Sequence, residues 1–284
     1  MLAKYHLGFL RRLGIRVAPF LTYTFVRNPL TLTILSAVEQ YLGNIQGKGS
    51  GSTDWNTEGE VNAASAHINR PKAVVFDVGA HRGEWSLQLL KALGPSSKCR
   101  IFQFEPSKRS QAALRSLNLS QTTLIEAAVG DNPGTATLYV PEGNFTDLAA
   151  LYPTTREFDF RNLARVEETV KVVTIDQIVA EFQLDTVDYM KLDVEGHELA
   201  VLRGARESLA SKRIKALGFE FGTPHLNSRT YFYDLWDFLR AYGYTIKRIC
   251  PGNILLPIEE YTEELEYYRN VSNYLALLDD FSQK

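Results

Sequence analysis

The sequence predicts an α/β fold whose largely parallel sheet is covered by helices on both faces, and three observations support this prediction. From residue 72 onward, short apolar runs rich in Val, Ile and Phe alternate with segments of helical periodicity. The first apolar run ends in a glycine-containing turn, within VVFDVGAHRGE at 74–84, that leads directly into a helical pattern. Two late apolar runs, 244–250 and 273–280, are predicted to close the sheet as an antiparallel pair.

The strand candidates are bounded by turn residues and lie at 73–79, 100–105, 122–130, 187–194 and 214–221. Helical spacing of apolar residues occurs at 83–94, 106–118, 197–211 and 230–243. Strands that alternate with helices pair in parallel through right-handed crossovers, which predicts a doubly covered sheet. Two runs in which polar and apolar residues alternate, 135–140 and 169–179, are predicted as half-exposed antiparallel or edge strands.

Composition and charge disfavour several classes of protein. The 284 residues are 45% hydrophobic and 23% charged, which is typical of a chain with one main globular domain. A net charge of -2 and a pI near 6.2 disfavour a nucleic-acid partner. Cys99 and Cys250 are far apart and have no ligand-spaced neighbours, so we expect no disulfide framework, no zinc site and a reducing, cytoplasmic location.

Changes in composition divide the chain into three parts. Residues 1–42 form a basic, amphipathic helical arm, residues 43–71 are predicted as a flexible linker, and residues 72–284 form the main domain. The arm lacks the apolar run of about 20 residues that a membrane span needs. Three interpretations remain open for it: packing on the domain or in a homo-oligomer, peripheral contact with a membrane surface, or an organelle transit peptide.

The turn after the first strand indicates a nucleoside cofactor. Asp77 ends the strand, Gly79 allows a tight turn, and Gly83 opens the helix. Glu105 ends the second strand 22 residues after Gly83, where an acidic residue binds a ribose diol in a βαβ nucleotide site. A pyrophosphate needs glycine where His81 stands, and Asp77 suits an ammonium group. These features favour S-adenosylmethionine, which has no phosphate.

The fourth strand end is predicted to carry the chemistry. The candidate catalytic residues are Asp193, Glu195, Glu220, His197 and His225. In one interpretation a carboxylate or imidazole accepts the proton of an alcohol that attacks a sulfonium methyl group. In a second, Asp193 and Glu220 hold a divalent cation, although no metal site is indicated otherwise. In a third, Glu195 and Glu198 only cap the following helix.

A long irregular segment between the two alternating runs is predicted to cover the site. It contains aromatic and polar residues suited to an acceptor: Asn144, Phe145, Tyr152, Phe158 and Arg161.

Five stretches of the chain together resemble one known family. FDVGAHRGEWS, FQFEPS, LIEAAVGD, KLDVEGHELAVLRGA and the strand ending in FEF are similar to the FkbM family of S-adenosylmethionine-dependent methyltransferases. The resemblance covers roughly residues 72–250 and implies the class I methyltransferase (Rossmann-like) fold, a seven-stranded sheet in the order 3-2-1-4-5-7-6 with strand 7 antiparallel. Residues 1–42 and the linker lie outside it.

The resemblance also implies which residues contact the cofactor. Asp77, Gly79 and Gly83 are expected at the methionine end and Glu105 at the ribose. Ala127, Ala128 and Val129 are expected against adenine, with Asp131 as a weaker candidate. The full set is Asp77, Gly79, Ala80, His81, Gly83, Glu105, Pro106, Ala127, Ala128 and Asp193.

The function that follows is methylation of a hydroxyl on a sugar, glycan or secondary metabolite. The first alternative is a cofactor-binding module that the arm tethers to a membrane or a partner as an assembly protein. A nicotinamide oxidoreductase is a weaker alternative, because the spacing around His81 is unsuitable and no Tyr-x-x-x-Lys pair follows the fourth strand. The sequence does not identify the acceptor.

Overall fold

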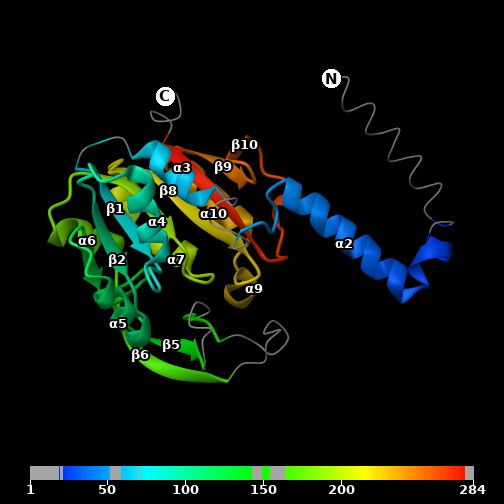
Figure 1. Cartoon of the computed structure of the whole chain (residues 1–284), viewed down its shortest axis with the longest axis horizontal. Coiled ribbons are helices and arrows are strands. Elements are labelled where there is room, and N and C mark those ends of the chain that lie inside the picture. The colour runs from blue at the N-terminus through cyan, green and yellow to red at the C-terminus, as the bar shows by residue number, and fades with distance from the viewer. Residues whose placement is uncertain are drawn as a thin grey trace. The chain divides into compact units, whose positions relative to one another are not determined.

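A computed structural model of the chain describes residue 19 and residues 22–51, 59–68, 70, 72–142, 149–153 and 164–278 (Figure 1). The chain divides into two compact units, Met1–Ile45 and Gln46–Lys284. We describe each unit by itself.

The first unit contains a π-helical turn, η1 (Thr22–Val26), and the helix α2 (Pro29–Ile45). Asn28 and Pro29 explain where α2 begins, because the Asn28 side chain accepts from the Leu30 N–H at 3.0 Å and proline suits the first helical position. None of the helices in the described ranges is long and apolar enough to cross a membrane.

The second unit is built on an eight-stranded sheet (Figure 1). Its strands lie in the order β10 (Ile254–Ile258), β9 (Tyr244–Cys250), β11 (Val271–Leu278), β8 (Ile214–Gly222), β7 (Val187–Leu192), β1 (Val74–Val78), β2 (Arg100–Phe104) and β3 (Thr122–Ile125). From β3 to β9 this is the predicted order 3-2-1-4-5-7-6, and β11 runs antiparallel to both neighbours. The expected count of seven is wrong by one, because β10 adds an antiparallel edge strand to β9.

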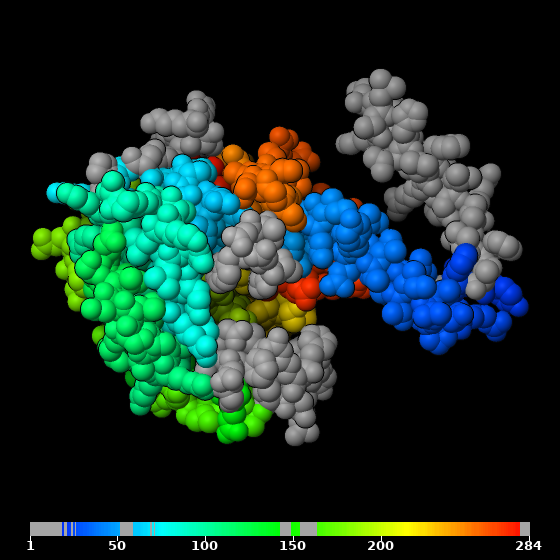
Figure 2. Space-filling view, in the orientation of Figure 1, coloured from blue at the N-terminus to red at the C-terminus, as the bar shows by residue number. Residues whose placement is uncertain are grey.

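Helices cover both faces of this sheet. On one face, α3 (Glu60–His67) and α4 (Glu84–Leu93) bury Trp85 and Leu89 with Val75 and Tyr189. On the other face, helices α6 (Ile175–Glu181), α7 (Glu198–Arg203), α8 (Arg206–Ala210) and α10 (Phe232–Ala241) enclose the larger core. α5 (Lys108–Leu117) packs beside the start of α4, and Figure 2 shows these two helices on one face of the surface in cyan and green. The predicted two-sided cover is confirmed.

The third predicted strand, 122–130, is interrupted. β3 ends at Ile125, where a turn closes between the Ala127 N–H and the Ile125 carbonyl at 2.9 Å. The chain then leaves the main sheet, and β4 (Ala128–Val129) pairs with β6 (Arg165–Val173). β6 also pairs antiparallel with β5 (Gly134–Pro141), which confirms the prediction that the two alternating runs are antiparallel. These three strands form a second, small sheet at the lower end of the view in Figure 1.

Two other predicted elements end earlier than the sequence indicated. The run 169–179 stops being a strand at Val173, because Thr174 and Gln177 form a reciprocal capping box that starts α6. The helix predicted at 197–211 is two helices, since Gly204 passes so close to the Gly130 carbonyl that a Cβ would lie 2.0 Å from it. The carboxylate of Asp176 then accepts from backbone N–H groups at the start of α8.

The segment predicted as a linker, 43–71, is partly built into the second unit. Val61, Ala63 and Ala64 of α3 are buried in the core, and the Gly51 N–H donates to the carbonyl of Val271 on β11 at 2.9 Å. The linker prediction is therefore wrong for these residues. The prediction failed because the small and polar residues of α3 give almost no helical pattern of large apolar side chains. Residues 52–58 lie outside the described ranges.

Candidate active site

Four carboxyl groups gather where neighbouring strands of the main sheet end. Asp77 is near the end of β1, Glu105 follows β2, Asp193 follows β7 and Glu220 lies near the end of β8. The charges of Asp77 and Asp193 act on Glu105, and those of Asp193 and Glu195 act on Glu220. The structure thus brings together the acidic residues that the sequence placed at separate strand ends.

The turn after β1 depends on both of its glycines. Gly79 has φ 85°, and a Cβ there would lie 1.8 Å from the carbonyl oxygen of Asp193. Gly83 has φ 84°, and a Cβ there would lie 2.7 Å from Leu117. The N–H groups of Gly79 and Ala80 both donate to the Phe104 carbonyl, at 3.0 and 3.1 Å. The turn is therefore fixed against β2 and β7 at once.

His81 adopts the left-handed region with φ 47°, which side chains other than glycine rarely do. Its N–H donates to Glu105 Oε2 at 2.8 Å, and the Ser107 N–H donates to Glu105 Oε1 at 2.8 Å. Burial raises the pKa of Glu105 to about 7, although both backbone donors oppose the shift. Glu105 thus shapes the turn through two backbone N–H donors, and Pro106 beside it is half-buried.

Asp77 comes just before this turn in the sequence, and its side chain is fully buried. Ser86 Oγ donates to Asp77 Oδ2 at 2.6 Å, while Oδ1 has no hydrogen-bond partner. Burial raises the pKa of Asp77, and the ammonium group of Lys191 opposes that shift. The unsatisfied Oδ1 is the atom left to accept a hydrogen bond through water, which is one of the two routes to an ammonium group that the sequence suggested.

Lys191 is a buried cation that sequence reasoning missed. Its Nζ donates to Asp193 Oδ2 at 2.8 Å, lies 3.9 Å from Asp77 Oδ1 and lies 5.8 Å from the ring centroid of Trp85. Burial lowers the pKa of Lys191, but the carboxylates of Asp193 and Asp77 more than reverse this, so its pKa lies well above its ordinary value. The one basic residue within the buried strand VDYMKL was the available signal.

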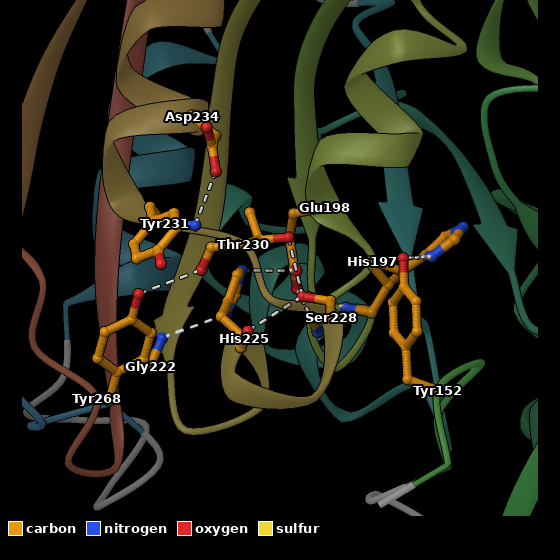
Figure 3. Close-up of polar contacts among 12 residues, drawn as sticks. Tyr152, His197, Glu198, Gly222, His225, Ser228, Thr230, Tyr231, Asp234 and Tyr268 are labelled. Atoms are coloured by element: carbon orange, nitrogen blue, oxygen red, sulfur yellow. Dashed lines mark hydrogen bonds and ion pairs between the residues drawn. The ribbon is translucent and has the colours of Figure 1, made fainter.

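The turn that follows β7 is held by a buried pair (Figure 3). Glu198 Oε1 accepts from the Val194 N–H at 3.2 Å and the Gly196 N–H at 3.4 Å, and Glu198 Oε2 lies 3.0 Å from His225 Nε2. Burial would raise the pKa of Glu198, but His225 lowers it overall. His225 Nδ1 accepts from the Gly222 N–H at 3.4 Å, so the proton of a neutral imidazole lies on Nε2.

Glu198 and His225 therefore tie the turn after β7 to the turn after β8. Both side chains are 1% exposed, which places His225 beneath the site rather than at its surface. Glu195 lies on the supported turn with φ 52°, next to Gly196 with φ 93°. The structure shows no side-chain cap on α7, and the Glu198 carboxylate instead accepts from two N–H groups of the turn before the helix.

His197 contacts the segment that was predicted to cover the site. Its Nδ1 lies 3.1 Å from the hydroxyl of Tyr152, and burial lowers the pKa of the imidazole (Figure 3). A β-bridge between Tyr139 and Ala150 holds the short segment that carries Tyr152. The other residues predicted in this cover, Asn144, Phe145, Phe158 and Arg161, lie outside the described ranges.

The residues expected to contact adenine lie beside His197 and Tyr152. Ala127, Ala128 and Val129 are buried where the chain leaves the main sheet, and Asp131 just beyond them is exposed. The charge of Asp131 acts on both His197 and Tyr152. A Cβ on Gly130 would lie 3.3 Å from His197 Nε2, so the third strand end and the turn after β7 face each other closely.

The alternative of a divalent cation finds no support. Asp193 is paired with Lys191, and in the described ranges no group of three or more His, Cys, Asp or Glu side chains is arranged to hold a metal ion.

The sheet order and the acidic strand ends define this protein as a class I methyltransferase-like α/β protein. Residues 77–246, more than half of the chain, match the family described as "Methyltransferase FkbM domain". The chain belongs to this family. The resemblance inferred from the sequence is therefore confirmed, and the alternative of a nicotinamide oxidoreductase is wrong.

A curated relative is similar to part of the chain. The "2-O-methyltransferase NoeI" of Sinorhizobium fredii is 26% identical over 155 residues, which are 51% of this chain and 63% of the relative. The match thus spans less than two thirds of the relative's length.

Solved structures show weaker similarity. Methyltransferase FkbM from Methylobacillus flagellatus has a TM-score of 0.44 and 19% identity, with 76% of this chain and 47% of that chain covered. Fibrillarin from Aeropyrum pernix, solved with S-adenosyl-L-methionine, has a TM-score of 0.40 and 12% identity, with 77% and 74% covered.

Proposed function

We propose that this protein is an S-adenosylmethionine-dependent O-methyltransferase whose acceptor is a hydroxyl group on a sugar or glycan. One observation carries the proposal: the cofactor turn and the acidic turn touch, because Gly79 lies against the carbonyl of Asp193. A methyl donor bound by the first turn would therefore lie beside the carboxylates of the second. The 2-O-methyltransferase relative supports the class of acceptor.

The residues present fit the cofactor. Glu105 offers carboxylate oxygens for a ribose diol. The buried Asp77 Oδ1 lies 3.9 Å from Lys191 Nζ but has no hydrogen-bond partner, so it is available for a water-mediated contact with an ammonium group. Gly79 and Ala80 themselves carry no bulky side chain. When bound, the cofactor supplies an electrophilic methyl group, whose bond to sulfur breaks with the electron pair retained by sulfur as the acceptor oxygen attacks.

The protein's own part is to align the hydroxyl and take its proton. We assign proton acceptance to a carboxylate of the turn formed by Asp193 and Glu195, which the Glu198 and His225 pair holds in place. Burial raises the pKa of Glu220 well above its usual value, as do the charges of Asp193 and Glu60. Because this shift disfavours the charged carboxylate, we assign the base to the turn and not to Glu220.

The test combines cofactor binding with turnover. Calorimetry of the full chain is expected to show binding of S-adenosylhomocysteine, and radiolabelled S-adenosylmethionine is expected to label a member of a panel of sugars and glycans. Asp193→Asn and Glu195→Gln are made separately, and the variant that lacks the base loses about 100-fold or more in kcat. Absence of cofactor binding would overturn the proposal. Binding without transfer to any acceptor would instead favour the cofactor-binding module.

A further inference from the structure

The arm helix α2 carries an apolar stripe that the fold of the second unit does not explain. Residues three or four apart fall on one side of a helix, and seven large side chains of α2 do so. They are Leu30, Ile34, Leu35, Val38, Tyr41, Leu42 and Ile45, each between 49% and 66% exposed. At about 100° per residue, this stripe spans about 140° of the helix circumference.

The rest of α2 is mostly polar and almost uncharged, with the exposed Leu32 as an apolar exception. The opposite side carries Thr33, Ser36, Gln40 and Asn44, and Glu39 is the only Asp, Glu, Lys or Arg residue of the helix. The stripe is wider than the narrow seam that two helices of a coiled coil bury between them. A broad apolar side of this kind would be buried more completely in an extended apolar phase than against one partner helix.

The charge of the preceding sequence points to the chemistry of that phase. Five basic residues, Lys4, Arg11, Arg12, Arg16 and Arg27, precede Glu39, and no acidic residue does. Two copies of the arm would bring like charges together, whereas anionic lipid headgroups neutralise them. The guanidinium group of Arg27 also lies 5.1 Å from the ring centroid of the exposed Tyr23, an aromatic residue of the kind found at membrane interfaces.

We propose that α2 lies in the surface of an anionic lipid bilayer, with its apolar stripe between the acyl chains and the basic residues before it at the headgroups. At about 1.5 Å per residue the helix is about 25 Å long, and it lies along the surface instead of spanning the bilayer. This contact would keep the methyltransferase domain at a membrane without any requirement on its catalytic chemistry.

Co-sedimentation of the full chain with vesicles tests the proposal. Binding to phosphatidylcholine vesicles that contain phosphatidylglycerol is expected to exceed binding to pure phosphatidylcholine by about tenfold or more. Added salt is expected to weaken the binding to the anionic vesicles.

Two double variants with the same change in charge separate the stripe from simple electrostatics. Ile34→Glu with Val38→Glu places both charges on the apolar stripe, and binding is expected to fall about 100-fold. Thr33→Glu with Ser36→Glu places them on the polar side, and a much smaller decrease is expected. Circular dichroism and calorimetry with S-adenosylhomocysteine check that both variants keep the helix and the domain.

Three results would overturn the proposal. The first is a full chain that stays in the supernatant with anionic vesicles. The second is an equal loss of binding in both double variants. The third is a dimer in sedimentation equilibrium that the stripe variant alone dissociates, because a second copy of the chain would then cover the stripe.

Discussion

Single buried carboxyl groups determine how this protein responds to pH. The carboxyl groups of Asp77, Glu105 and Glu220 all have pKa values raised by burial, whereas His225 lowers the pKa of Glu198. A group whose pKa is raised on folding binds its proton more tightly in the native state. The free energy of unfolding therefore falls as pH rises through the interval between the unfolded and folded pKa values.

Glu105 gives the sharpest test of this effect. Its pKa of about 7, against an ordinary value of 4.5, predicts a contribution of about 3 kcal/mol that is lost between pH 4.5 and pH 7. Glu105→Gln is expected to flatten that part of the stability profile, measured by urea unfolding across this range. The same substitution at the exposed Glu181 serves as the control and is expected to leave the profile unchanged.

The Glu198→Ala substitution tests the buried pair. It removes the acceptor for two N–H groups of the turn and leaves His225 Nε2 buried without its partner. We expect the free energy of unfolding to fall by about 3 kcal/mol or more. Glu207→Ala, at an exposed helix position, is the matched control and is expected to change it by less than about 0.5 kcal/mol. Equal effects of the two substitutions would contradict the bridging role of Glu198.

The sequence indicated which acidic residues lie at the strand ends more readily than it indicated which residues contact each other. Glu105 and Asp193 were placed correctly at strand ends, because each follows a short apolar run. The contact between Glu198 and His225 joins residues 27 positions apart, and that between Lys191 and Asp77 joins residues 114 positions apart. Spacing along the chain carries no information about such pairs, because their proximity arises from the pairing of the strands.

At the scale of elements, the turn after β1 is fixed by the space available to it. Gly79 and Gly243 have similar positive φ angles, 85° and 82°. A Cβ on Gly79 would meet the Asp193 carbonyl, whereas a Cβ on Gly243 would meet nothing within 4 Å. A comparison of the same substitution at the two positions therefore separates the cost of steric overlap from the intrinsic cost of a left-handed backbone.

Alanine substitutions at these positions are expected to differ in cost. Gly79→Ala should lower the free energy of unfolding by more than about 4 kcal/mol, because β1 and β7 must separate, and it should abolish binding of S-adenosylhomocysteine. Gly243→Ala should cost only about 1–2 kcal/mol and retain binding. Thermal unfolding and calorimetry of both variants measure the difference. A mild effect at Gly79 would show that the two turns are not rigidly joined.

The elements that the sequence predicted correctly have long apolar runs or strong alternation, as in β1, β7 and β8. The errors occur where short-range polar contacts decide the outcome. The capping box at Thr174 ended a strand, and a turn at Ile125 divided another. α3 escaped prediction because Val61 is the only large apolar residue among its buried side chains, so periodicity of large apolar residues does not reveal it.

At the scale of the whole molecule, the chain divides into two compact units, and we expect the arm and the domain to have separate stabilities. Both large core clusters of the second unit are composed of residues from Val61 onward. Removal of residues 1–45 is therefore expected to leave the thermal midpoint within about 3 °C of that of the full chain and to retain binding of S-adenosylhomocysteine. Scanning calorimetry of both proteins provides the measurement, and a large drop in the midpoint would mean that the arm contributes to the core.

The close approach of Gly79 to Asp193 also bears on how members of such a family diverge. Since the turn after β1 and the turn after β7 are packed backbone to backbone, neither can be reshaped without disturbing the other. Under the proposed function the transferred methyl group would then stay in one position, and a new acceptor would have to reach it. Adaptation to new acceptors is accordingly left to surfaces away from this contact, above all the cover segment around Tyr152.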